Sequence, residues 1–157
     1  MTAKADFNAD EWTTLANAPA LAGLAVGAAD RGGTLREAMS MARVYQEARA
    51  GSHSALIEAL LASPPAIDPK TAGAGGQEGI ADKAAETVQA ATDLLRAKAT
   101  EDELSEYGDF VHAVCTTVAK AHKEGGTLGF GGKDVSEAEQ TVIDRLAVAL
   151  GPRPGGG

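Results

Sequence analysis

The feature that most constrains the fold of this chain is a helix-start pattern that occurs four times. In each copy a Ser, Thr or Asn is followed three residues later by Glu. The four pairs are Asn8–Glu11, Thr34–Glu37, Thr100–Glu103 and Ser136–Glu139. In such a capping box the first side chain accepts a hydrogen bond from the first helical turn, and the Glu accepts one from the cap's own amide. Each pair therefore predicts the start of a helix.

Apolar residues recur every three or four positions in the stretches that follow, which is the spacing of a helix with one buried face. The predicted helices cover 10–29, in two pieces (10–17 and 21–29), and then 35–50, 53–61 with Ser52 as its cap, 80–95, 101–118 and 137–150. No stretch alternates apolar and polar residues over the length of a strand, so we expect no sheet. The prediction is an all-α fold, a compact bundle of five to six helices.

Pro19 interrupts the first of these apolar stretches. Proline lacks the amide that a helix interior uses, so we expect a bend or break between Asn17 and Pro19 and a restart at Leu21. Gly23 and Gly27 then lie one turn apart in the second piece. Residues this small let a neighbouring helix approach closely.

Two apolar stripes flank the short turn near Thr100. The stripe residues are Val88 and Leu95 before the turn, and Val111, Val114 and Val118 after it. Their matching period and the short connection predict an antiparallel hairpin in which the two stripes are buried against each other.

The chain has 157 residues, a length typical of one domain, and we assign that domain to 1–151. A Gly- and Pro-rich loop is expected at about 64–79 and a disordered tail at 152–157. The net charge of −8 argues against nucleic acid and anionic membrane surfaces as partners. The longest apolar run, 18–29, is short of the ~20 residues of a membrane span. With one cysteine and no apolar leader segment, we expect a cytoplasmic protein without membrane insertion.

The residues that carry chemistry form no known catalytic or metal motif. His53, His112 and His122 are scattered, and Cys115 lies beside an apolar stripe where a small buried residue is expected. The segment 129–134 lacks the first glycine and the hydroxyl residue of a phosphate-binding loop. We therefore expect a protein that is not an enzyme and has no assigned cofactor. A hydrolytic or metal-dependent enzyme that gathers Asp, Glu and His from separate helices is the alternative.

The segment Leu24-Ala-Val-Gly-Ala-Ala-Asp30-Arg-Gly-Gly-Thr-Leu-Arg-Glu37 resembles the A-D-G-x-x-x-x-x-E helix-loop-helix element of the bacterial tellurite-resistance family TerB. Asp30 and Glu37 match the two acidic positions of that element. A second copy recurs in 118–124 and 132–139, so the resemblance also implies two pseudo-repeated helix-loop-helix halves.

This resemblance implies a compact helical protein of a metal-ion stress response that acts as an accessory module with a protein partner. It also implies a divalent cation held by Asp30 and Glu37. Calcium takes about six to eight oxygen ligands, so Asp134 and Glu139 would have to join them. In the structural alternative, Glu37 is only a capping residue and the chain is an interaction module without a metal site. A homo-oligomer is compatible with both.

Overall fold

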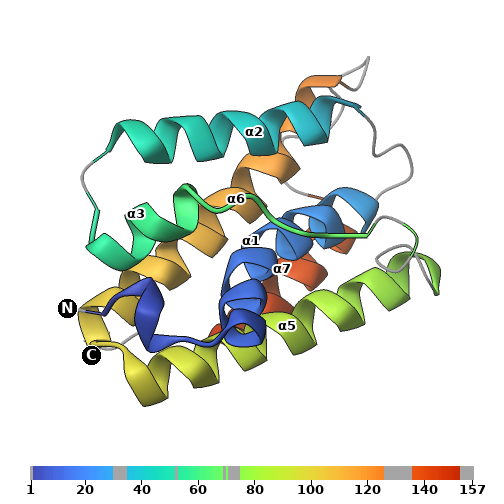
Figure 1. Ribbon diagram of the computed structural model, residues 1–157. Helices are drawn as coiled ribbons and strands as arrows, with labels where there is room; N and C mark the ends of the chain where they lie inside the picture. The colour runs from blue at the N-terminus through green and yellow to red at the C-terminus, as the bar shows by residue number, and fades with distance from the viewer. Residues whose placement is uncertain are drawn as a thin grey trace.

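The computed structural model describes residues 2–29, 35–51, 53–68, 70, 75–125 and 136–152, with the backbone alone described for 35–40 and 122–125. The elements in these ranges are a 3-10 turn, Lys4–Asp6, and the helices α1 (Ala9–Ala29), α2 (Leu35–Ala50), α3 (Ala55–Leu61), α5 (Gly76–Lys98), α6 (Glu101–Gly125) and α7 (Glu137–Leu150). The described residues contain no strand, and the helices pack into one bundle (Figure 1). The predicted all-α bundle is confirmed.

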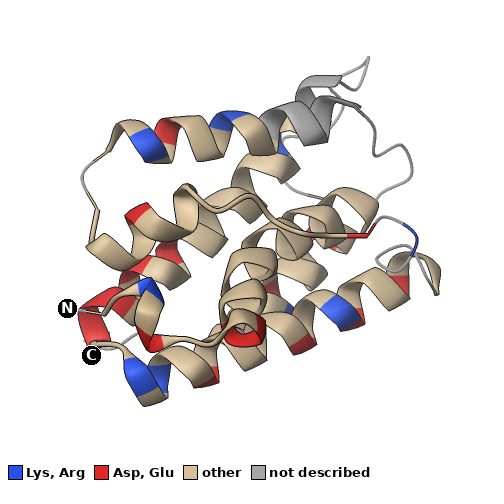
Figure 2. Ribbon diagram, viewed as in Figure 1, with Lys and Arg blue, Asp and Glu red and all other residues tan. Residues whose placement is uncertain are grey.

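The helix α1 lies at the centre of this bundle. Its buried residues occur on every side of the helix between Trp12 and Gly27, and it packs against α5, α6, α7 and α2 (Figure 1). Its charged residues are Asp10 and Glu11 in the first turn, whereas α2, α5, α6 and α7 each carry charged residues at several positions (Figure 2). A helix that is apolar all round is stable only when neighbours cover it on all sides, which explains its central place.

The break that we expected at Pro19 does not occur, because α1 runs through the proline as one helix. Pro19 cannot supply the amide that would donate to the carbonyl of Leu15, four residues earlier. The hydroxyl of Tyr107 on α6 donates to that carbonyl instead, at 2.8 Å, and both residues are fully buried. A side chain from another helix thus replaces the hydrogen bond that proline removes.

The two stripes around Thr100 are buried as predicted, but not as a simple hairpin. Their five residues, Val88, Leu95, Val111, Val114 and Val118, are all fully buried in one core. However, α5 and α6 diverge after the turn, and each makes far more contacts with α1 than with the other (Figure 1). The predicted direct pairing is wrong, because the apolar central helix occupies the space between them.

The predicted capping boxes are confirmed wherever the structure describes them. Both hydrogen bonds of a capping box are present at Asn8–Glu11, Thr100–Glu103 and Ser136–Glu139. The cap of α3 is Ser54, whose hydroxyl accepts from the amide of Ile57. The predicted start of this helix at 53, with Ser52 as its cap, is therefore wrong: α3 begins at Ala55, because Ser54 is the hydroxyl residue three positions before the amide that it caps. Thr34 lies outside the described residues.

Helix α5 begins earlier than predicted, at Gly76 rather than Ile80, which shortens the expected loop at 64–79. Gly75 precedes it with a left-handed backbone, φ 84°. Gly76, the first residue of the helix, also has a positive φ, 69°, and glycine adopts this backbone without steric cost because it has no Cβ.

Gly23 allows close packing of α1 against two neighbours. A Cβ at this position would lie 2.5 Å from Met41 Sδ on α2 and 2.9 Å from Val114 Cγ1 on α6. The predicted close approach at Gly23 is therefore confirmed, and Gly27 is buried as well.

Candidate functional site

The structure describes only part of the predicted cation site. Asp30 and Asp134 lie outside the described residues, and so does the side chain of Glu37. Glu139 is described: it is buried and closes the capping box with Ser136 at the start of α7. No group of three or more His, Cys, Asp or Glu within the described ranges is placed to hold a metal ion. The cation site at Asp30 and Glu37 stays a prediction.

A second acidic residue, Glu103, is buried at the corner between α5 and α6. Its carboxylate accepts hydrogen bonds from the amide and hydroxyl of Thr2, at 2.9 and 2.6 Å, and from the amide and hydroxyl of Thr100, at 2.9 and 3.2 Å. Burial alone would raise the pKa of Glu103, but these hydrogen bonds to Thr100 and Thr2 outweigh it and lower the pKa to about 2. Glu103 thus fastens the N-terminal segment to the start of α6.

This arrangement predicts a specific loss of stability in acid. A carboxyl group with a lowered pKa in the folded state stabilises the fold above its usual pKa of 4.5, and that contribution disappears as the pH falls from 4.5 towards 2. Glu103→Gln should therefore unfold at a lower urea concentration than the wild type at pH 7. This gap between the two urea midpoints should be smaller at pH 3.

Urea titrations at both pH values measure this gap. Glu101→Gln, an exposed residue in the same turn, controls for the loss of one negative charge. A gap of equal size at pH 7 and pH 3 would contradict the role assigned to the ionised carboxylate.

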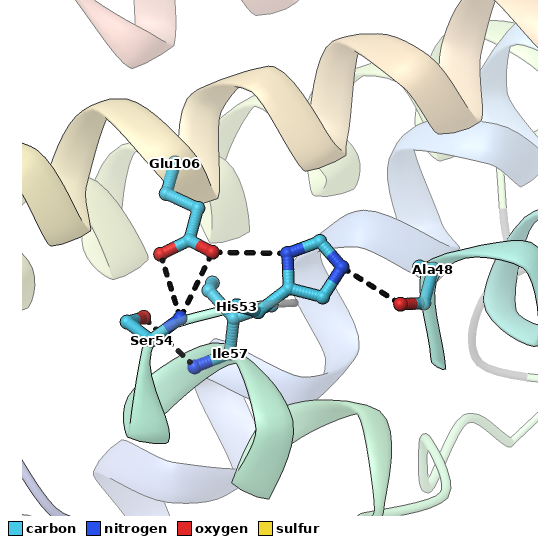
Figure 3. Close-up of polar contacts among 5 residues, drawn as sticks. All are labelled: Ala48, His53, Ser54, Ile57 and Glu106. Atoms are coloured by element: carbon cyan, nitrogen blue, oxygen red, sulfur yellow. Dashed lines mark hydrogen bonds and ion pairs between the residues drawn. The ribbon is translucent and has the colours of Figure 1, made fainter. Parts of the chain in front are cut away.

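His53 and Glu106 form a polar cluster that joins three helices (Figure 3). Oε1 of Glu106 on α6 lies 3.0 Å from Nδ1 of His53, and the same carboxylate accepts from the amide of Ser54 at the start of α3. Nε2 of His53 lies 2.7 Å from the carbonyl oxygen of Ala48, in the last turn of α2. We call this set of contacts the His53 clasp.

The clasp resembles the histidine–carboxylate pair of many hydrolases, but its geometry is that of a structural contact. A catalytic histidine held by a carboxylate through one nitrogen uses the other to move a proton to or from a nucleophile or substrate. In this protein the other nitrogen is directed to the Ala48 carbonyl, and the hydroxyl of Ser54 accepts from Ile57. The contacts hold the α2–α3 corner, by which we mean the end of α2 at Ala48 and the cap of α3 at His53 and Ser54, against α6.

The other two reactive residues that the sequence singled out have ordinary environments. Cys115 is 2% exposed, and burial raises its pKa to about 12, which keeps the thiol protonated and unreactive. His112 is exposed on α6, as expected. The predicted role of Cys115 as a small buried residue is confirmed.

A small pocket lies between α6 and the end of α7. Its lining residues are mainly apolar or small: Leu104, Ser105, Gly108, His112, Ala147, Leu150, Gly151 and Pro152. Val148 belongs to the same turn of α7, and 79% of its side chain is exposed. A Cβ on Gly108 would meet no atom within 4 Å, so this helix surface is open. We call the pocket and Val148 the α6–α7 patch.

Comparison with protein-family models, curated proteins and solved structures finds no match to the chain. None of the described helices combines the length and apolar composition that a bilayer crossing requires.

Sequence reasoning missed both the His53 clasp and the α6–α7 patch. His53 and Glu106 are 53 positions apart, and neither belongs to a motif. The patch had a weak signal, because Val148 does not fit the inward-facing period of Ile143, Leu146 and Leu150.

Proposed function

We propose that this chain is a non-enzymatic helical accessory protein that acts by binding a protein partner through the α6–α7 patch. The observation that carries the proposal is Val148, a large apolar side chain that is 79% exposed beside a pocket lined by Leu104, Ala147 and Leu150. A strongly exposed large apolar side chain close to an apolar depression gives a partner both a contact and a place to insert a side chain of its own.

The role of the polar residues supports the non-enzymatic part of this proposal. The best-placed histidine and carboxylate, His53 and Glu106, are committed to each other and to the backbone, while Glu103 is committed to Thr2 and Thr100. The resemblance to the TerB family adds the expectation of an accessory role in a stress response.

Val148→Glu tests the interaction surface. The new charge on the patch should abolish binding of the partner, but should leave the urea midpoint unchanged because the side chain is exposed. Quantitative affinity capture from the native cell, with wild type and variant compared side by side, measures the first effect. Thr141→Glu, at another exposed position of α7, is the matched control.

Proteins enriched by the wild type and by Thr141→Glu, but lost with Val148→Glu, support the proposal. Equal enrichment of the same proteins by the wild type and both variants would mean that this surface is not the binding site. A second copy of the chain is one partner that fits, and light scattering of wild type and Val148→Glu detects it.

We also propose that the chain binds a divalent cation through Asp30 and Glu37. This proposal rests on the match of these two residues to the acidic positions of the TerB element. Calorimetric titration with Ca²⁺, Mg²⁺ and Zn²⁺ tests it, with Asp30→Asn/Glu37→Gln as the control. Heat and a rise in melting temperature for the wild type alone support a cation site. If the wild type shows neither effect, the proposed cation site is wrong, and the chain is an interaction module without a metal site.

A further inference from the structure

We propose that the His53 clasp is a pH-sensitive device that holds the α2–α3 corner on α6 when His53 is protonated and loosens it when the proton is lost. The decisive observation is that both ring nitrogens face acceptor atoms (Figure 3). Nδ1 faces the carboxylate of Glu106 at 3.0 Å, and Nε2 faces the carbonyl oxygen of Ala48 at 2.7 Å.

Only the doubly protonated ring can donate to both atoms. A neutral imidazole carries one N–H, and its other nitrogen presents a lone pair. If the proton stays on Nδ1, the lone pair of Nε2 faces the Ala48 oxygen. If it stays on Nε2, the lone pair of Nδ1 faces the carboxylate of Glu106. Either tautomer replaces one hydrogen bond by a repulsive contact between two acceptors.

Two groups with negative charge or partial negative charge face the ring. From α6 the ring faces the negative charge of Glu106, and from α2 it faces the last turn, where the helix dipole is negative. Ser54, which begins α3, directs its amide to Glu106 rather than to the ring. The other charged residues near this corner are Arg49, which donates to the carbonyl of Leu61, Glu47, which pairs with Arg43, and Glu58 in the first turn of α3. Within the described residues, Glu106 is the charged side chain paired with His53.

The clasp is accessible to protons, and its release would be local. The side chains of His53 and Glu106 are 24% and 28% exposed, so solvent reaches both. Beneath them, Leu56 and Ile57 of α3 are fully buried in the core. Loss of the proton should therefore loosen the end of α2 and the cap of α3 at Ser54, while the buried side chains of Leu56 and Ile57 keep α3 and the rest of the bundle folded.

Histidine is the side chain that ordinarily changes charge between pH 5 and 8, and the chain contains three. The His112→Gln/His122→Gln background leaves His53 as the sole histidine. In this background, amide hydrogen exchange is measured at pH 5.5 and pH 8 and expressed as protection relative to the unfolded chain, which corrects for the intrinsic effect of pH. His53→Gln in the same background is the control.

Protection of the amides of Gly51, Ser54 and Ile57 should fall by about tenfold from pH 5.5 to pH 8. This fall corresponds to the lower end of the free energy that a hydrogen bond to a charged group contributes. Protection of the Leu95 amide in α5 should change little. Adding His53→Gln should remove the pH response. Glu106→Gln, which keeps an acceptor for Ser54, should reduce it. Equal protection at both pH values, or a fall that persists in His53→Gln, would overturn the proposal.

Discussion

Leu95→Ala should lower the free energy of unfolding by about 2 to 5 kcal/mol. Leu95 is fully buried in the core, where α5 packs on the central helix α1. The substitution removes buried apolar atoms and also leaves a cavity that the surrounding helices fill only in part. The loss is large compared with the ~5 to 15 kcal/mol that stabilise a typical domain.

Chemical denaturation followed by circular dichroism measures this effect. Val148→Ala is the matched control, because it also shortens an aliphatic side chain but at a position that is 79% exposed. Its free energy of unfolding should stay within about 0.5 kcal/mol of the wild type. Equal midpoints for Leu95→Ala and Val148→Ala would mean that the stripe on α5 is not part of the core.

The helix starts were predictable from sequence because they depend on residues close together in the chain. In the boxes at Asn8 and Ser136, cap and Glu are three positions apart, and no distant residue is needed to form them. The same local signals explain why the all-α fold class was correct. The arrangement of the helices was less predictable, since the stripes around Thr100 showed which faces are buried but not which helix covers them.

The candidate sites were harder to predict because they combine residues from distant segments. The His53 clasp depends on where the end of α2 meets α6, and the α6–α7 patch on how α7 ends beside Leu104. Asp30 and Glu37 were chosen by resemblance to a short motif, and the described residues do not test them.

The break predicted at Pro19 is absent for the same reason, because the hydrogen bond that replaces the missing one comes from a distant residue, Tyr107 on α6. Removing this bond should have a large effect on stability. Tyr107→Phe should lower the free energy of unfolding by about 1 to 3 kcal/mol, because it leaves the buried carbonyl of Leu15 without its donor. Burial raises the pKa of Tyr107, so the wild-type hydroxyl keeps its proton and can donate throughout the neutral range.

A double-mutant cycle with Pro19→Ala tests the cause of this loss. Alanine restores the amide at position 19, so the carbonyl of Leu15 regains a donor from within α1, as in an ordinary helix. Tyr107→Phe should then cost clearly less than in the wild-type background, with a coupling of about 1 kcal/mol between the two positions. Urea denaturation of the wild type, both single variants and the double variant gives this coupling. If the two effects add to within about 0.5 kcal/mol, as for independent sites, α1 tolerates its proline without help from α6. A clear coupling would instead mean that Tyr107, 92 positions away from Leu15, is what lets a helix containing proline form the centre of the bundle.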